Sequence, residues 1–308
     1  MYNARMVTKA QGQSKHASTL RLVILDSHAI LHRAYHAVPD FSTSKGEPTG
    51  ALYGLASTLI KAVNDLKPDY IVAARDLPGK TNRHELFEEY KATRVKAEPE
   101  LVEQLGKAPS VFEAFGIPVY AAAGYEADDV IGTIVKKLHS RKDVNSIIVT
   151  GDMDTLQLVS KQVKVYTMRK GITDTLLYDE DAVRERFGFS PEQMVDYKAL
   201  RGDPSDNIPG IRGIGEKTAT DLIQAFSSLE EMYRVLAKNP IEFSEKGFKP
   251  RIVELLQGGR EAAALSKRLA TIHPDVPIEF SLPERRWSMG DNASTIVELC
   301  EKLEFRSL

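Results

Sequence analysis

The sequence predicts an α/β fold with a parallel sheet, followed by a mostly helical lobe. Short, nearly continuous apolar runs rich in β-branched residues recur in the first half of the chain, amphipathic helical patterns separate them, and the strand patterns stop near residue 190. Strands that are apolar on both faces and alternate with helices are typical of parallel sheets covered on both sides. A chain of 308 residues is long enough for both parts.

The expected elements alternate along the chain. The strands are LRLVILD (20–26), YIVAARD (70–76), IPVYAA (117–122), SIIVTGD (146–152) and KVYTM (164–168), and the helices cover 50–66, 101–116 and 128–140. SPEQ at 190–193 has the form of a capping box with Pro at the first helical position, and SLEE at 228–231 is a second one. We therefore expect an α/β core at 21–189 and a helical lobe at 190–308.

Composition restricts the class of protein. Residues 1–20 contain no acid and no apolar targeting segment, so we expect a disordered basic leader or a later start at Met6. The single Cys300 excludes a disulfide framework and a cysteine-rich zinc site, and no apolar run is long enough for a membrane span. The net charge of −2 does not suggest a basic nucleic-acid binder, but segregated acids and bases would cancel in this sum.

Acidic residues gather where the expected strands end. Asp26, Asp76 and Asp152 each close a strand, and GYEADDVIG at 124–132 follows another. The carboxyl ends of parallel strands share one edge of a sheet, where open α/β folds bind ligands. One acid at a strand end has an ordinary structural explanation, but a converging set would repel strongly without cations. The set is Asp26, Asp76, Glu126, Asp128, Asp129, Asp152, Asp154, Asp203 and Asp206.

This acidic set predicts a divalent-metal site. Ligands that are all carboxylate oxygens favour Mg²⁺ or Mn²⁺. More than five carboxylates exceed what one octahedral ion uses, which indicates two ions. Two ions about 3.5–4 Å apart are the arrangement that hydrolyses phosphodiesters by in-line displacement.

A glycine-rich turn, GIRGIGEKTATD at 210–221, opens a further helix. Gly210, Gly213 and Gly215 permit a tight turn and a close approach of phosphate to the backbone at a helix N-terminus, with Lys217 in its first turn. The glycines could also be ordinary turn punctuation. Their position directly after the acids of GDPSDN favours a clamp on a DNA backbone beside the metal site.

A basic segment with aromatic residues, RHELFEEYKATRVK at 83–96, follows the second strand. Its cations Arg83, Lys91 and Arg94, with Tyr90 among them, suit phosphate contact and stacking on a single strand. The alternative is an ordinary solvated helix face, because the segment also carries three glutamates.

With these motifs in view, the sequence resembles the 5′→3′ exonuclease domain of bacterial DNA polymerase I and the related phage flap endonucleases, which are structure-specific 5′ nucleases. The matching stretches run in family order from about residue 22 to 308: LDSHAILHRAYHA, TSKGEPTGALYG, DLPGKTNRHELFEEYKATR, GYEADDVIGT, VTGDMDTLQLV and DYKALRGDPSDNIPGIRGIGEKTA. The resemblance implies a PIN-like parallel-sheet nuclease core with a helical arch at about 80–110. It also implies a helix–three-turn–helix motif, a kind of helix-hairpin-helix, in the lobe.

The resemblance further implies two-metal hydrolysis of DNA, as a 5′→3′ exonuclease and 5′-flap endonuclease in primer removal during replication and in DNA repair. It assigns Asp26, Asp76, Glu126 and Asp128 to the first Mg²⁺ or Mn²⁺, Asp152, Asp154, Asp203 and Asp206 to the second, and Asp129 close to both. Lys91, Arg94 and Arg33 would act at the scissile phosphate. Arg83, Tyr90, Lys217 and the glycine turn, which would hold a K⁺ ion, would contact DNA.

The implied partners are branched or nicked DNA, including a 5′ flap or an RNA primer–DNA hybrid, and a DNA polymerase, fused or separate. A monomer in the cytoplasm, associated with the nucleoid and not with a membrane, is expected. Arg75, Asn82 and Met153 depart from the family pattern, but none of them removes an expected ligand.

Three alternatives remain. A PIN-type ribonuclease would use the same scaffold on RNA but would lack the GIRGIGEK turn. A DNA-junction binder without metal would have no use for nine acids. A phosphatase interpretation of GDMD lacks the rest of that machinery.

Overall fold

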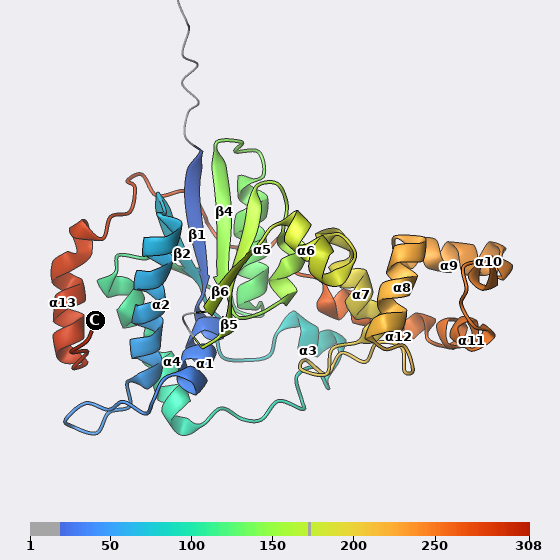
Figure 1. Ribbon diagram of the computed structural model, residues 1–308. Coiled ribbons are helices and arrows are strands. Elements are labelled where there is room, and N and C mark those ends of the chain that lie inside the picture. The colour runs from blue at the N-terminus through green and yellow to red at the C-terminus, as the bar shows by residue number, and fades with distance from the viewer. Residues whose placement is uncertain (1–18, 172–173) are drawn as a thin grey trace, which may run out of the picture.

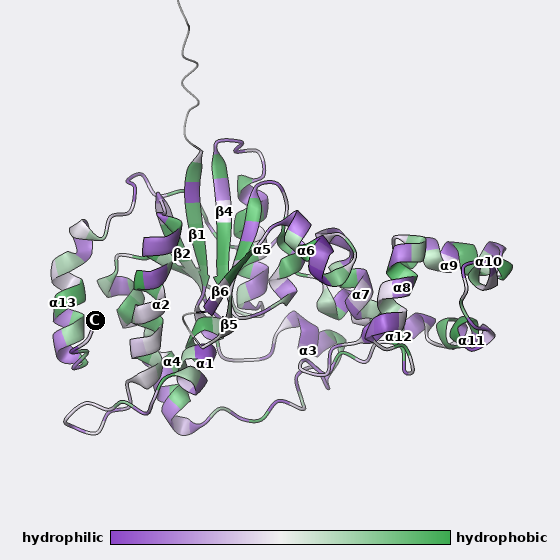
Figure 2. Cartoon of the chain, in the orientation of Figure 1, coloured by the Kyte–Doolittle hydropathy of each residue, from purple (hydrophilic) through white to green (hydrophobic). Residues whose placement is uncertain are grey.

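The computed structural model describes residues 19–171 and 174–308, so almost all of the expected leader at 1–20 lies outside the described residues. A central sheet carries helices on both faces, and a helical lobe extends from one side of it (Figure 1). The strands are hydrophobic along much of their length (Figure 2), as expected for a sheet that is buried on both faces. None of the helices in the described part of the chain combines the length and apolarity that a bilayer span needs.

The sheet has six strands in the order β3-β2-β1-β4-β5-β6. They are β1 (Leu20–Asp26), β2 (Tyr70–Ala74), β3 (Val119–Tyr120), β4 (Val144–Thr150), β5 (Val163–Lys170) and β6 (Asp174–Tyr178). All neighbours are parallel except β5 and β6. The predicted α/β fold with a parallel sheet is confirmed, while the antiparallel edge strand β6 is an addition. The strand order reverses between β1 and β4, which places a ligand crevice at their carboxyl ends.

Both faces of the sheet are covered. On one face, Val23 and Leu25 belong to a buried cluster with α1 (Ser27–Ala37), α2 (Gly50–Leu66) and α4 (Pro99–Ala114). On the other, Leu22 and Ile24 pack in a cluster with α5 (Ala127–Leu138), α6 (Glu180–Phe187) and the lobe. Successive side chains of a strand point to opposite faces, so β1 supplies both cores and is fixed at the centre.

The expected arch at about 80–110 is only partly helical. It consists of the short helix α3 (Asn82–Leu86), a run of turns and open chain over 87–98, and then α4 (Figure 1). Lys91 has a φ of 58°, a left-handed conformation that a regular α-helix does not contain. The YKATR stretch therefore forms turns and is not the face of a helix.

The lobe is helical, as predicted. It contains α7 (Met194–Arg201), α8 (Glu216–Phe226), α9 (Leu229–Lys238), α10 (Ile241–Glu245), α11 (Pro250–Gly258) and α12 (Arg260–Ala270), and short 3₁₀ turns form at Asp154–Leu158, Pro191–Gln193 and Gly290–Asn292. Ser190 and Gln193 form a reciprocal capping box, and the Ser228 side chain accepts a hydrogen bond from the Glu231 amide. In the described residues no strand follows β6.

After α12 the chain leaves the lobe and returns to the α/β core, unlike the expected 190–308 boundary. The helix α13 (Ala293–Lys302) packs against α4 on the far side of the sheet (Figure 1). The indole of Trp287 donates a hydrogen bond to the Phe115 carbonyl, and Leu299 joins the cluster under α2 and α4. Beyond α13, Glu304 accepts hydrogen bonds from Ser44, and the hydroxyls of Ser307 and Tyr53 lie 3.0 Å apart. The lobe proper therefore ends near residue 270.

Candidate active site

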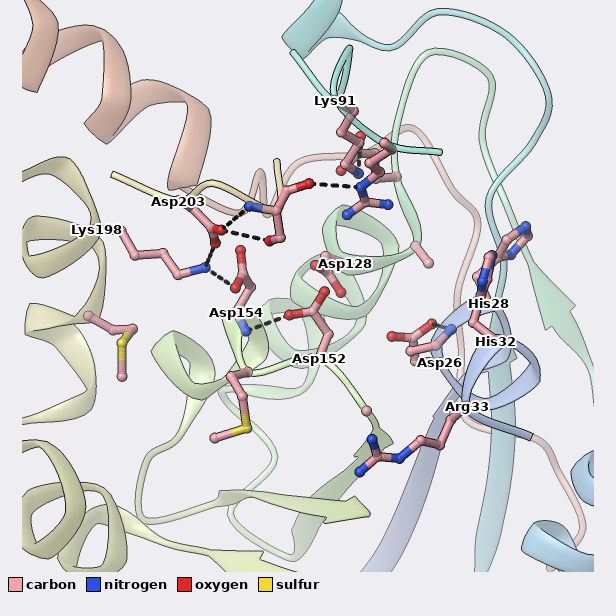
Figure 3. Close-up of a pocket in the computed structure, with 18 of the residues that line it drawn as sticks. Asp26, His28, His32, Arg33, Lys91, Asp128, Asp152, Asp154, Lys198 and Asp203 are labelled. Carbon is pink, nitrogen blue, oxygen red and sulfur yellow. Dashed lines mark hydrogen bonds and ion pairs between the residues drawn. The ribbon is translucent and has the colours of Figure 1, made fainter. Parts of the chain in front are cut away.

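An open cavity of about 800 Å³ lies between the carboxyl ends of β1, β2 and β4 and the helices α6 and α7 (Figure 3). This is the edge of the sheet that the strand-end acids predict. Seven of the nine expected acids line it: Asp26, Asp76, Glu126, Asp128, Asp152, Asp154 and Asp203. Its wall also includes Arg33, Lys91, Arg94 and Lys198. The cavity is thus lined by carboxylates with cations among them.

Asp26 stands at the junction of β1 and α1. It caps α1 by accepting a hydrogen bond from the Ala29 amide over 3.1 Å, and its other oxygen accepts one from the Thr150 hydroxyl over 2.6 Å. Thr150 ends β4, which is the neighbour of β1 in the sheet. Two adjacent strand ends therefore fix the orientation of this buried carboxylate.

The GYEADDVIG stretch forms the start of α5. Glu126 is the N-cap of α5, and the side chain of Asp129 accepts a hydrogen bond from the Glu126 amide over 3.1 Å. The Asp76 side chain, which follows β2, accepts from the Ala127 amide over 2.6 Å. These acids satisfy amides at a helix N-terminus, where the macrodipole favours negative charge. Asp128 is left facing the cavity.

A second group of acids surrounds Lys198. The lysine ammonium reaches between Asp154 and Asp203 (Figure 3), contacts Asp154 closely and lies 2.7 Å from Asp203. Asp203 also accepts from the amide and hydroxyl of Ser205, 2.9 and 2.6 Å away. The amide of Asp154 donates to Asp152 over 2.9 Å. One buried lysine therefore offsets part of the negative charge of this group.

The arch supplies cations to a third group. The ammonium of Lys91 lies 2.8 Å from Glu126 and 3.8 Å from Asp206. Arg94 is ion-paired with Asp206 and donates to the Ser205 carbonyl over 3.2 Å. These contacts bring the arch directly to the acids, so Lys91 and Arg94 are not ordinary solvated surface charges.

Comparison with known proteins covers most of the chain. Residues 21–188 match the family described as "5'-3' exonuclease, N-terminal resolvase-like domain", and residues 189–293 match "5'-3' exonuclease, C-terminal SAM fold". This chain belongs to the 5′-3′ exonuclease family. The predicted family membership is thereby confirmed.

This chain is 41% identical over 291 residues to DNA polymerase I of Caldicellulosiruptor bescii, and the match covers 94% of this chain and 33% of that protein. It is 39% identical over 289 residues to DNA polymerase I of Bacillus subtilis, with 94% and 32% covered. The chain thus spans about a third of the length of these curated relatives.

Two solved structures share the fold of the exonuclease. One is the 5′-exonuclease of bacteriophage T5 bound to zinc, with a TM-score of 0.63, 23% identity, and 82% of this chain and 90% of that chain covered. The other is the T5 flap endonuclease in a complex with DNA and metal ions, with a TM-score of 0.64, 22% identity, and 91% and 99% covered.

Burial makes the charges of the cavity costly in the exonuclease. Burial, reinforced by repulsion from Asp76 and Asp152, raises the pKa of Asp26 to about 7 despite its two hydrogen bonds. Burial and the neighbouring Asp152 and Asp26 hold the pKa of Asp128 well above its usual range. Without added positive charge, Asp26 therefore loses its proton only near neutral pH, and Asp128 also keeps its proton above the usual range of a carboxyl.

The two acids that Lys198 contacts have pKa values shifted in opposite directions. Burial raises the pKa of Asp154 to about 7, although Lys198 opposes the shift. For Asp203 burial acts in the same direction, but the charge of Lys198 and the hydrogen bonds from Ser205 outweigh it and lower the pKa to about 2. The pKa of Lys198 itself is raised: burial would lower it, and the two acids overcome that effect.

Arg83 and Asp129 pair with each other away from the cavity. The guanidinium holds the carboxylate through two hydrogen bonds of 2.7 and 2.8 Å, and both side chains are at most 5% exposed. Arg83 also donates to the carbonyls of Leu269 and Thr271. This placement contradicts the expected DNA contact at Arg83 and the expected metal contact at Asp129, because neither side chain has a free direction in which to make it.

Tyr90 also differs from its expected role. It is 3% exposed, and its hydroxyl donates to Asp206 over 2.9 Å and lies 3.2 Å from Glu126. Its ring is buried and is therefore not a stacking surface for DNA. Asp206 makes these contacts behind the cavity wall, where Arg94 and Tyr90 enclose it.

The glycine turn lies at the start of α8. Gly210 and Gly213 have positive φ values of 58° and 96°, and a Cβ at Gly210 would lie 2.2 Å from the Gly202 nitrogen, so Gly210 is required by the turn itself. Gly215 is the N-cap of α8, and a Cβ there would meet no atom within 4 Å. Lys217 is exposed and pairs with Asp221. Gly215 and Lys217 therefore face solvent.

The residues of the cavity fit hard divalent cations. In the part of the chain that the structure describes, no three Asp, Glu, His or Cys side chains form a ready metal cluster. The contacts of Lys91, Arg94 and Lys198 explain this, because cations stand among the acids. The donors are nevertheless all carboxylate oxygens, which suit Mg²⁺ or Mn²⁺, and the raised pKa values of Asp26, Asp128 and Asp154 indicate that positive charge is lacking.

Two contributions were not foreseen from the sequence. Lys198 is the central cation of the Asp154 and Asp203 group, and its position in VDYKALRGD, five residues before Asp203, was the available signal. His28, the second residue of α1, accepts a hydrogen bond from the Asp76 amide over 3.3 Å. Arg33, which was expected near the reacting phosphate, lines the cavity and donates to the Met168 carbonyl.

Proposed function

We propose that this exonuclease hydrolyses phosphodiester bonds of branched or nicked DNA near the junction of single strand and duplex, with two divalent cations bound in the cavity. The observation that supports this proposal is the convergence of seven acids from β1, β2, β4, α5 and the lobe on one open cavity. The family name describes a 5′-3′ exonuclease, and one structural relative of the same fold is a flap endonuclease in a complex with DNA and metal ions.

The acids divide by position into two sets. Asp26, Asp76, Glu126 and Asp128, from β1, β2 and α5, would hold one ion, and Asp152, Asp154 and Asp203 would hold the other, with Asp206 supporting it from behind. When bound, such ions lower the pKa of water to give a nucleophile and stabilise charge on the attacking and leaving oxygens. Mg²⁺ or Mn²⁺ is the proposed identity, because the donors are hard oxygens.

The cations of the chain would position the phosphate. Lys91 and Arg94 now neutralise Glu126 and Asp206, so charge supplied to these acids by metal would free both side chains for the scissile phosphate. Arg33, held by the Met168 carbonyl on the cavity wall, adds a third cation. Such preorganised donors act on the charge that develops in the transition state.

The glycine turn would hold the duplex part of the substrate. Gly215 and Lys217 lie at the N-terminus of α8, where amides and the helix dipole favour phosphate. We propose that backbone carbonyls of the turn also bind a K⁺ ion against the duplex phosphates. These contacts carry no base information, so the preference would be for the structure of the DNA and not for its sequence.

The biological setting is proposed from the relatives. They are DNA polymerases of which this chain covers about a third, so we propose action beside a DNA polymerase, fused or separate, in primer removal and repair. A monomer at the nucleoid in the cytoplasm would fit this role.

The test is a cleavage assay with a labelled 5′-flap DNA in Mg²⁺, in excess EDTA, and beside an RNA of matching sequence. We expect cleavage of the flap DNA near the junction, products with a 5′-phosphate and a 3′-hydroxyl, and no cleavage in EDTA. Undiminished cutting in EDTA would contradict the metal mechanism. Faster cutting of the RNA would favour the PIN-type ribonuclease alternative.

A further inference from the structure

Beyond the acids, the cavity is lined by a wall of arginines supported by aromatic rings. The helices α6 and α7 contribute Arg186, Phe187, Tyr197 and Arg201, which line the same cavity as the acids. We propose that Arg201 and Arg186 bind backbone phosphates of the cleaved strand on its path from the acids to the glycine turn. This inference rests on the proposed function, because it places a strand in the cavity.

Arg201 lies between the two parts of the proposed site. It is three residues after Lys198 on α7, so the two side chains share one face of the helix. Lys198 contacts Asp154 and Asp203, whereas an Arg201 nitrogen lies 3.9 Å from Glu216, the first residue of α8. Arg201 therefore covers the interval between the metal-binding acids and the turn that would hold the duplex.

The guanidinium of Arg201 is held in place by a ring. Its central carbon lies 5.8 Å from the centroid of the Tyr197 ring, and Tyr197 is 3% exposed. A guanidinium held near a fixed ring by a cation–π contact still has N–H donors for a charged acceptor such as phosphate. The ion pair with Glu216 is long and exposed, so it contributes little and can give way to a phosphate.

Arg186 repeats this arrangement on α6. Its guanidinium lies 5.1 Å from the Phe187 centroid and 5.6 Å from that of Tyr178, and it donates to the Tyr178 hydroxyl. The ring of Phe189 lies 5.9 Å from Phe187 and 5.2 Å from Tyr197. A continuous aromatic layer therefore supports both arginines.

Charge determines the occupant of this wall. The acids make the rest of the cavity repel a polyanion, so a strand that enters needs cations along its path on both sides of the bond that is cut. Lys91 and Arg94 supply them on the arch side. Arg201 and Arg186 supply them on the side of the lobe, and the anionic group that a guanidinium binds in an extended strand is the backbone phosphate.

The test is DNA binding by fluorescence anisotropy in EDTA, where the proposed mechanism allows no cleavage, with a labelled 5′-flap duplex at several salt concentrations. Arg201→Gln should weaken binding by about threefold to tenfold and reduce the slope of log Kd against log salt by about 1, the effect of one lost phosphate contact. Arg186→Gln should act in the same direction. Arg184→Gln is the matched control, because Arg184 lies on the same helix, pairs with Asp181 and is not part of the cavity wall.

A second arm tests the contact itself. A single methylphosphonate, which removes one backbone charge, is moved along the cleaved strand between the junction and the duplex. At the contacted position it should weaken binding by the wild type and remove the difference between the wild type and Arg201→Gln. Thermal unfolding checks that each variant is folded, and Arg201→Lys, which keeps the charge, should retain most of the salt slope.

The outcomes separate the two proposals. If Arg201→Gln and Arg186→Gln bind with the affinity and salt slope of Arg184→Gln, the arginine wall does not contact phosphate and the inference is overturned, whatever the cleavage assay gives. If the wild type cuts no 5′-flap DNA in Mg²⁺, the proposed function fails independently of these binding data.

Discussion

The guanidinium of Arg83 and the carboxylate of Asp129 are joined by two hydrogen bonds of 2.7 and 2.8 Å, outside the lining of the acidic cavity. This pair connects the arch to α5, and Arg83 extends the connection to the carbonyls of Leu269 and Thr271 at the end of α12. One buried ion pair therefore joins the arch, the nuclease core and the lobe.

Removing Arg83 should destabilise the protein severely. Arg83→Met leaves the buried Asp129 charge unpaired, which typically costs about 3–5 kcal/mol, whereas Arg94→Met, a half-exposed residue of the same arch, should cost at most about 1 kcal/mol. Chemical denaturation at pH 7 measures both.

The same pair predicts a dependence on pH. Burial raises the pKa of Asp129, but Arg83 outweighs burial and the pKa is lowered. The stabilising effect of the pair is therefore present above the unfolded pKa of about 3.9 and is lost as pH falls through the lower folded value. The difference between Arg83→Met and wild type should therefore shrink in acid, and a constant difference would contradict the assignment.

Lys198 should compete with divalent metal. Because its ammonium contacts Asp154 and Asp203, Lys198→Met should lower the melting temperature of the metal-free protein and tighten Mn²⁺ binding, measured by calorimetry. The rise in melting temperature on adding Mn²⁺ should exceed that of wild type. Weaker Mn²⁺ binding by Lys198→Met would show that the lysine orders the acids instead of occupying their site.

The metal-free protein should lose stability as pH rises. The pKa of Asp26 is raised to about 7, so the stability linked to its protonated form is present below the unfolded value of about 3.9 and is lost as pH rises through 7. In EDTA, the free energy of unfolding should be lower at pH 8.5 than at pH 5.5 by on the order of a few kcal/mol. Asp26→Asn, which cannot ionise, should flatten this dependence, and an unchanged slope in Asp26→Asn would assign it to other groups.

Lys91 should affect rate more than affinity. If it stabilises the scissile phosphate in the transition state, Lys91→Ala should reduce the single-turnover cleavage rate about 10²–10³-fold, while DNA affinity changes much less. Lys96→Ala, an exposed residue of the same arch, is the control and should stay within about threefold of wild type, the range expected for a solvated surface charge. A Lys91→Ala rate that matches the Lys96→Ala rate would remove Lys91 from the reaction.

Gly215→Val should weaken duplex binding without unfolding the lobe. A Cβ at Gly215 meets no atom within 4 Å, so the added side chain projects into the space that a phosphate backbone would occupy. Gly258→Val, at another position with open space, controls for the substitution itself. Binding to two unrelated duplex sequences should fall equally, because phosphate contacts carry no base information. Retained affinity, or a loss for one sequence alone, would contradict the proposed clamp.

Most of the fold could be predicted because buried parallel strands leave a strong sequence signal. The expected helix at 50–66 has the bounds of α2, and the strand at 20–26 those of β1. The strand β6 carried no such signal, since DTLLY is short and lies at an edge. The packing of α13 against the core could not be predicted, because its partner α4 lies far away in the sequence. An amphipathic pattern shows that a helix has a buried face but not which surface that face packs against.

The site was predictable where position in the sheet decides it. Asp26 ends β1, and Asp76 and Asp152 follow the ends of its two neighbours β2 and β4, so topology alone brings them to one edge. Asp129 could not be separated from Asp128 by type or spacing, yet successive residues of a helix point about 100° apart, so they face different surroundings. The pairing of Lys198 with Asp154 spans 44 residues and depends on how the lobe meets the sheet.

The contacts of Ser44 with Glu304 and of Tyr53 with Ser307 have a consequence for the order of folding. They join positions separated by 260 and 254 residues, so each closes a loop that contains nearly the whole described chain. Loop closure of this length is entropically costly until the intervening parts are in place. These contacts should therefore form after the sheet and the lobe, and they should open first in local fluctuations, with early amide hydrogen exchange near residues 44 and 304. Such an opening would release the last turns of the chain and leave the acids of the cavity undisturbed.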